Sequence, residues 1–170
     1  MKAALKQSRV SMLICAAVSA GLLVSNGVQA GGTTPLTVNA KISGTCKVTT
    51  APGTLDFGTI DPSSGVNATA STTLVMKCSN GTTSTAATDN NGAFFSVTKR
   101  MQHSVTTTSF LPYAIVYVND AGFAGAGFAA AAPSQTITIN GTITPAQFAP
   151  ALITTGAQLY ADTVTITVNP

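Results

Sequence analysis

The chain has 170 residues, of which only 8% are charged, and its formal net charge is +3. Lys2, Lys6 and Arg9 supply that excess, because removing these three leaves five of the 8 basic residues against 5 acidic ones. A neutral surface does not attract phosphate backbones, so nucleic-acid binding is not expected. A low density of charge also favours self-association.

The first thirty residues have the organisation of a secretory signal peptide. An apolar run from about Val10 to Val24 follows the basic tip, and a polar stretch then ends in Val28-Gln29-Ala30. Small residues are typical of a cleavage site, so residues 1–30 are predicted to be removed between Ala30 and Gly31. The apolar run is too short to span a bilayer comfortably, and no stable membrane insertion is expected.

An alternating segment follows the predicted cleavage site. Between Leu36 and Ile42 every second residue is apolar, so in an extended strand Leu36, Val38, Ala40 and Ile42 would share one face. Such a segment can pair with its own domain or with a neighbouring molecule. The alternation taken alone favours a first strand of the same domain.

Two of the cysteines, Cys46 and Cys78, belong to the predicted mature chain. In an exported protein a lone pair of cysteines normally forms a disulfide, and no close spacing or activating neighbour favours a redox-active pair. The third cysteine, Cys15, could mark a lipid anchor, but Ile14 rather than a small residue precedes it.

Short β-patterns separated by turn residues occupy the rest of the chain, and no long amphipathic helix competes with them. The predicted strands are Thr69–Cys78, Tyr113–Val118, Gln135–Ile143 and Ala161–Val168; the second is expected to be largely buried. The other three alternate, and their predicted inward residues are Leu74, Met76, Cys78, Ile137, Ile139, Ile143, Val164, Ile166 and Val168. Many short strands with intervening turns predict an all-β sandwich.

A low-complexity patch of alanine and glycine runs from Ala121 to Ala132 and includes Phe123 and Phe128. We expect a flexible loop whose two rings pack on the sandwich. The alternative is an exposed apolar finger that touches a surface or a neighbouring subunit.

Few residues suggest catalysis or metal binding. His103 is the only histidine, lies between polar residues and is expected to be solvated. Asp56 and Asp61 flank a turn without the ligand density of a calcium loop, so we expect them to cap turns. No catalytic, metal or cofactor site is therefore predicted, and an enzyme is not expected.

Several segments, in their order along the chain, resemble the spore coat protein U domain family, which includes the Csu-type archaic chaperone–usher pilins. The segments are Leu36–Ile42, Thr45-Cys46-Lys47-Val48, Leu55-Asp56-Phe57-Gly58, Cys78-Ser79-Asn80-Gly81, Arg100-Met101, Leu111-Pro112-Tyr113, Val116-Tyr117, Asn119-Asp120 and Tyr160–Val168. The resemblance implies an immunoglobulin-like β-sandwich that lacks one strand and is completed by a donor strand from a neighbouring subunit. Residues 31–43 would be the donor-strand extension, with Leu36, Val38, Ala40 and Ile42 as its anchors, and residues 44–170 the pilin domain.

The resemblance also implies partners and a location. A periplasmic chaperone would first occupy the open position, and an outer-membrane usher would then exchange it for the extension of an identical or related subunit. The chain would thus be a structural subunit of a surface fimbria used in adhesion and biofilm formation. The alternatives are a secreted, monomeric surface-binding module and a coat protein that forms no fibre.

Overall fold

The computed structural model describes residues 32–170, so the predicted signal peptide and its Ala30–Gly31 cleavage site lie outside the described residues. The chain divides into two units, Met1–Ala40 and Lys41–Pro170. In the first unit, residues 32–40 contain no helix or strand. The second unit contains every described helix and strand.

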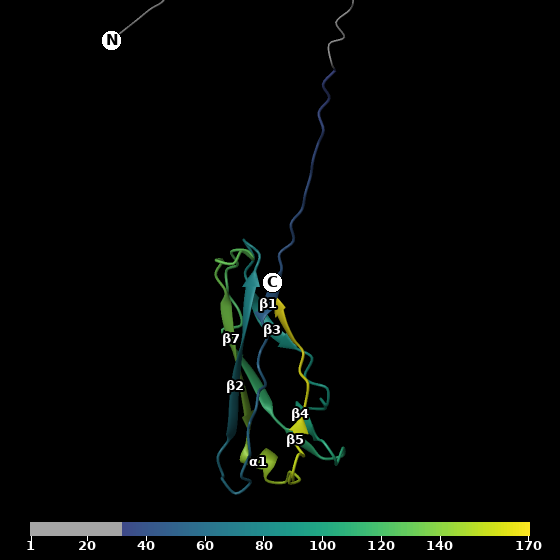
Figure 1. The fold of residues 1–170 in the computed structure, drawn as a ribbon, viewed down its shortest axis with the longest axis vertical. Helices are drawn as coiled ribbons and strands as arrows, with labels where there is room; N and C mark the ends of the chain where they lie inside the picture. Colours follow the sequence, from purple (N-terminus) through teal and green to yellow (C-terminus); the bar gives the residue numbers. More distant parts are fainter. Residues whose placement is uncertain (1–31) are drawn as a thin grey trace, which may run out of the picture. The chain divides into compact units, whose positions relative to one another are not determined.

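One layer of the second unit is an antiparallel four-stranded sheet (Figure 1). Its strands are β1 (Cys46–Thr50), β2 (Ala68–Cys78), β7 (Gln135–Ile143) and β6 (Ala114–Val118), in the order β1-β2-β7-β6. The central pair, β2 and β7, is in register without interruption from Ala68↔Ile143 to Met76↔Gln135. Alternating threonine, valine and isoleucine residues suit this pair, because branched side chains pack well on a pleated surface.

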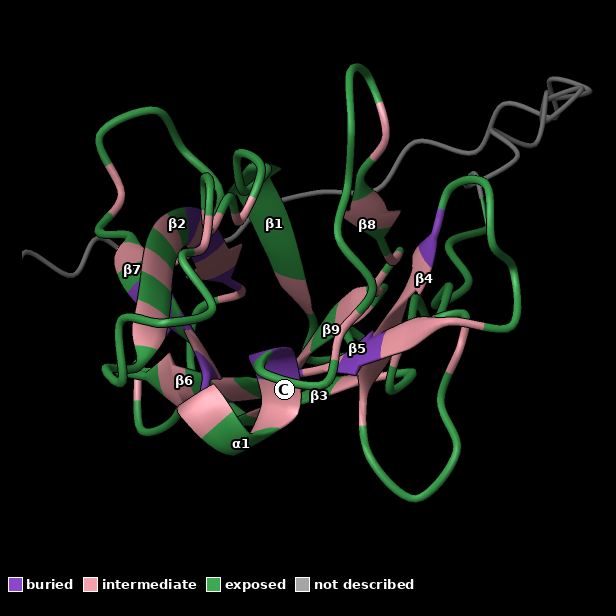
Figure 2. Cartoon of the chain, turned by 90° about the horizontal axis from the view of Figure 1, so that it is seen from below, coloured by how far each residue is buried: buried purple, intermediate pink, exposed green. Residues whose placement is uncertain are grey.

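The other layer consists of short paired strands. β3 (Thr85–Asp89) pairs with β9 (Ile166–Asn169), and β4 (Arg100–His103) lies between β5 (Phe110–Pro112) and β8 (Tyr160–Ala161). Figure 2 looks along the strands, with β2 and β7 on one side and β4 and β8 on the other. A single-turn helix, α1 (Pro145–Phe148), follows β7, and the Thr144 N–H donates to Gln147 Oε1 at 2.7 Å to close its first turn.

The core lies between the layers and confirms most of the predicted inward residues. Leu74, Met76, Cys78, Ile137 and Ile143 are 0% exposed and Ile139 is 2% exposed. A second buried cluster joins Leu111, Tyr113, Ile143 and Phe148, so α1 covers the core near the beginning of β2.

The prediction of a largely buried strand at Tyr113–Val118 was wrong for one of its faces. Tyr113 is buried, but Val116 and Val118 are 60% and 40% exposed. The strand β6 is an edge strand, and its alternate side chains point away from the core.

The predicted strand Ala161–Val168 keeps its alternation but is interrupted between β8 and β9. Val164, Ile166 and Val168 are half-buried and the threonines between them are exposed. At the interruption Asp162 Oδ1 accepts the N–H groups of Ala93 and Thr163, both within 2.8 Å, and Asn90 Oδ1 accepts that of Thr165 at 2.9 Å. Side-chain oxygens therefore replace part of the backbone ladder.

The loop Ala121–Ala132 is tied to the sandwich by its backbone. The N–H groups of Gly125 and Gly127 donate to the carbonyls of Thr82 and Cys78, at 2.7 and 2.9 Å. A Cβ at Gly125 would lie 2.3 Å from the Ser79 carbonyl oxygen, so only glycine allows this close approach. Phe123 packs on the core as expected, whereas Phe128 remains 43% exposed.

Candidate strand-acceptor edge

The two layers follow the strand arrangement of an immunoglobulin sandwich with one place unfilled. The order β1-β2-β7-β6 corresponds to strands A-B-E-D, β3 with β4 takes the place of strand C, and β8 with β9 that of strand F. In that sandwich strand G lies beside strand F. Among residues 32–170, β9 pairs only with β3 and β1 pairs only with β2. The place of strand G, beside β9, is thus unfilled by any described strand.

Side chains beside this open edge face the core but are incompletely covered. Val48 is paired with Met76, so the two share a face of the sheet; Met76 is 0% exposed and Val48 is 40% exposed. Across the sandwich, Ile166 and Val168 of β9 pack against the same core cluster and are only half-buried. The apolar surface left open is therefore located where a further strand would place its own apolar face.

The chain between β1 and β2 runs along the core side of the four-stranded sheet. Leu55 and Phe57 approach Gly141 of β7 so closely that a Cβ there would lie 2.6 Å from the Phe57 ring. Both side chains are half-buried. Glycine at position 141 thus makes room for the Phe57 ring.

The predicted anchor residues are exposed in the structure. Leu36, Val38 and Ile42 are 85%, 81% and 95% exposed, and residues 32–44 carry no strand assignment. The expectation from alternation alone, that this segment is the first strand of its own domain, does not match this description. Ala40 is exposed as well. The anchoring role of these four residues stays a prediction.

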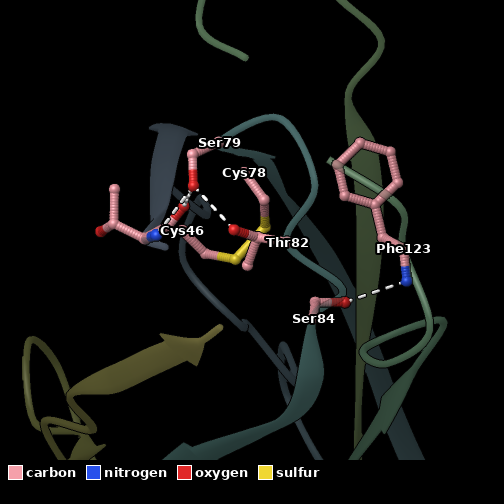
Figure 3. Close-up of a disulfide and its surroundings, with 7 residues drawn as sticks. Cys46, Cys78, Ser79, Thr82, Ser84 and Phe123 are labelled. Carbon is pink, nitrogen blue, oxygen red and sulfur yellow. Dashed lines mark hydrogen bonds between the residues drawn. A yellow bond between two sulfur atoms is a disulfide. The ribbon is translucent and has the colours of Figure 1, made fainter. Parts of the chain in front are cut away.

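A disulfide joins Cys46 and Cys78, the first residue of β1 and the last of β2, as the sequence predicted. Around it, the Thr45 N–H donates to Ser79 Oγ at 2.9 Å and the Ser79 hydroxyl lies 2.8 Å from that of Thr82 (Figure 3). The chain therefore enters the sandwich at a point fixed covalently to the central strand β2.

Tyrosine hydroxyls and carboxylates connect the two layers. Tyr117 of β6 donates to Asp89 of β3 at 2.6 Å, and Lys99 forms an ion pair with the same carboxylate at 2.8 Å. Burial raises the pKa of Asp89, but hydrogen bonds from Lys99, Tyr117 and the Asn91 N–H outweigh it and hold that pKa below its usual range. Burial, followed by the hydrogen bond to Asp89, raises the pKa of Tyr117. The Asp89 carboxylate therefore stays charged and the Tyr117 hydroxyl stays neutral at physiological pH, and together they connect the two layers.

The expectation that His103 is solvated was wrong, because its side chain is 1% exposed. Its Nδ1 accepts the N–H groups of Val105 and Thr106 at 3.2 and 2.9 Å, and its ring stands edge-on to Tyr160 at 5.0 Å. The histidine thus shapes the turn after β4. Polar neighbours in the sequence suggested exposure, but the backbone donors of the turn made burial possible.

The two aspartates near the first long loop cap turns, as expected. Asp56 Oδ1 accepts the Gly58 N–H and Asp61 Oδ1 accepts the Ser63 N–H, each at 2.8 Å. Within residues 32–170 there is no group of three or more histidine, cysteine, aspartate or glutamate side chains placed to hold a metal ion. None of the helices in that range is long and apolar enough to cross a membrane.

The fold formed by residues 32–170 is an immunoglobulin-like sandwich in which these residues leave one strand position vacant. The sequence profile of the Spore Coat Protein U domain matches residues 32–167, and the chain belongs to this family. No curated protein matches the sequence.

Among solved structures, the chain is similar to one in the CsuC–CsuE chaperone–tip adhesion subunit pre-assembly complex from the archaic chaperone–usher Csu pili of Acinetobacter baumannii. The identity is 20% and the TM-score 0.44, and the match covers 75% of this chain and 40% of that one.

Proposed function

We propose that this protein is a structural subunit of a chaperone–usher surface pilus, assembled by donor-strand exchange. The observation that carries the proposal is the vacant place beside β9, flanked by core-facing side chains that are only partly buried. Family membership supports it as well. The vacant place is filled by the segment Leu36–Ile42 of a neighbouring copy.

The segment suits this place in its pattern of apolar residues. Leu36, Val38, Ala40 and Ile42 present one apolar face, and burying a large side chain of this kind is worth about 1.5–3 kcal/mol. Backbone hydrogen bonds to β9 and β1 would set the register. A slip by one residue would turn all four anchors outward, so the register is strongly specified.

The donor segment Leu36–Ile42, here called the arm, and the open edge are different surfaces of one chain. The contact between neighbouring subunits is therefore head to tail. Repetition of such a contact without closure gives a fibre. Before assembly, a periplasmic chaperone covers the open edge, and an outer-membrane usher exchanges it for the arm of an identical or related subunit. The predicted signal peptide supports export through the periplasm to the cell surface, where the fibre serves adhesion and biofilm formation rather than catalysis.

The proposal is tested by supplying the missing strand within one chain. A copy of residues 36–42 is appended after Pro170 through a short glycine-rich turn, and the mature domain with its own arm deleted is purified without a chaperone. Because β9 ends on the disulfide side, a strand that follows it can turn back and pair antiparallel with it. We expect a soluble monomer that is several kcal/mol more stable than the same domain without the appended strand.

The matched control carries aspartate in place of Leu36, Val38 and Ile42 in the appended copy only, and we expect no gain in stability from it. Equal unfolding curves for the two forms would contradict the proposal. A fully stable arm-deleted monomer without any addition would favour the monomeric binding module or a coat protein that forms no fibre.

A further inference from the structure

The two ends of the sandwich differ in what they carry. The disulfide end contains Cys46, Cys78 and the loop Ala121–Ala132, which packs against Cys78. The helix end contains α1 and the loops 104–109 and 149–159, which are joined by the Ser104 N–H donating to the Leu159 carbonyl at 2.9 Å. The strand β1 begins at the disulfide end and β9 finishes there, since Cys46 pairs with Cys78 and Asn169 with Thr85.

The direction of the incoming strand follows from this arrangement. In an immunoglobulin sandwich the strand beside F is antiparallel to it. Because β9 runs toward the disulfide end, a donor strand beside it runs toward the helix end. Leu36 of the donor therefore lies near the acceptor's disulfide end, and Ile42 lies near its helix end.

The length of the connection then brings two domains together. Only Ser43, Gly44 and Thr45 separate Ile42 from Cys46, where the donor's own sandwich begins. Four Cα–Cα steps span at most about 14 Å in a fully extended chain. The helix end of the acceptor must thus lie close to the disulfide end of the donor.

Both of these ends expose apolar surface. On the helix end, Val105, Leu152, Ile153 and Leu159 are 64%, 45%, 70% and 52% exposed, and neither loop contains a charged residue. On the disulfide end, the alanine- and glycine-rich loop 121–132 contains no charged residue and exposes 43% of Phe128. Two lysines contact this loop: Lys47 Nζ lies 5.9 Å from the centre of the Phe128 ring, and Lys77 Nζ donates to the Ala129 carbonyl at 2.8 Å. Exposed apolar surface of this kind is costly unless another molecule covers it.

We infer that the helix end of each subunit docks on the disulfide end of the neighbouring subunit that donates a strand to it. A second copy of this chain is therefore the occupant of the apolar helix-end face. This inference rests on the proposed function, because the strand contact is what brings the two ends together. The docking contact adds to the strand contact and limits bending between neighbouring domains. The Ala121–Ala132 loop is thereby a subunit interface and not a receptor-binding finger.

The test is cysteine cross-linking in polymers of the full chain, exported together with the chaperone and usher that assemble it. The double variant Phe128→Cys with Ile153→Cys is treated with a short bifunctional maleimide, and the strand contacts are then dissociated by heating in detergent. We expect a ladder of covalently linked subunits, several-fold stronger than that of the control Phe128→Cys with Val97→Cys. Val97 is 91% exposed but lies between β3 and β4, away from both ends.

Each outcome bears on a different part of the inference. Polymers that form and yield no more cross-linked product than the control would overturn the docking and leave the pilus function intact. Failure of the parent chain to form polymers, although it folds and is exported with the chaperone and usher, would overturn both. As a second measurement, Ile153→Asp polymers should bend more sharply in electron micrographs than Val97→Asp polymers, and equal stiffness would overturn the docking.

Discussion

Ile137 in the centre of the four-stranded sheet and Ile166 at the open edge both point into the sandwich, yet they are covered very differently. Ile137 is 0% exposed, with paired strands on both sides of β7, whereas Ile166 is half-buried on a strand paired on one side only. The same residue type therefore contributes different amounts of stability within one chain. The centre is complete in a single copy, whereas the edge would be completed by the donor strand that we propose.

The largest effect is expected from a charge in the arm. Val38→Asp should abolish linkage between subunits, because the carboxylate would enter the apolar edge of the acceptor, while subunit–chaperone complexes remain intact. The measurement is polymer formation on native gels, with chaperone co-purification in parallel. Asn39→Asp is the matched control, since residue 39 lies on the other face of the strand. Normal polymers from Val38→Asp would remove Val38 from the set of anchors.

The next largest effect concerns the disulfide that holds the edge strand β1 to the central strand β2. Cys46→Ser should lower the free energy of unfolding by about 3–4 kcal/mol under oxidising conditions, because the bridge closes a loop with a sequence separation of 32. Thermal unfolding with and without reductant measures this loss. Under reducing conditions the variant and the parent should unfold at similar temperatures, and a difference that persists there would contradict the role of the bridge.

The comparison of centre and edge is sharpened by making the same substitution in both. Ile137→Ala should cost about 2–5 kcal/mol, whereas Ile166→Ala should cost about 1–2 kcal/mol in the domain alone, because part of Ile166 already contacts solvent. Urea unfolding gives both values. In the domain with the appended donor strand the cost of Ile166→Ala should rise toward that of Ile137→Ala. Equal costs in the domain alone would show that the edge is already closed.

The smallest effect is expected from acid. The pKa of Asp89 is lowered in the folded state, so the stability that its carboxylate contributes is present above the ordinary aspartate pKa of about 3.9 and is lost as pH falls through the lower folded value. Urea unfolding between neutral pH and about pH 3 should show this loss. Asp89→Asn should be less stable at neutral pH and less sensitive to acid. If the stability of Asp89→Asn fell with acid as steeply as that of the parent, other groups would be the cause of the pH dependence.

Much of the sheet centre could be read from the sequence, because alternation identifies the inward residues of β2 and β7 wherever both neighbours are paired strands. The errors lie where neighbours along the chain do not decide the environment. Val116 and Val118 are exposed because β6 is an edge strand, and His103 is buried because backbone donors of its own turn satisfy Nδ1. No local pattern indicates either of these facts.

The sequence by itself determined the all-β class, the pairing of Cys46 with Cys78 and the apolar face of the arm, since each depends on residue type and spacing over short distances. Only the tertiary structure decided that the edge beside β9 is left open by residues 32–170, that Val48 faces it half-exposed and that the apolar loops lie at opposite ends of the sandwich. These features depend on which strands become neighbours, and that is set by contacts between residues far apart in the chain.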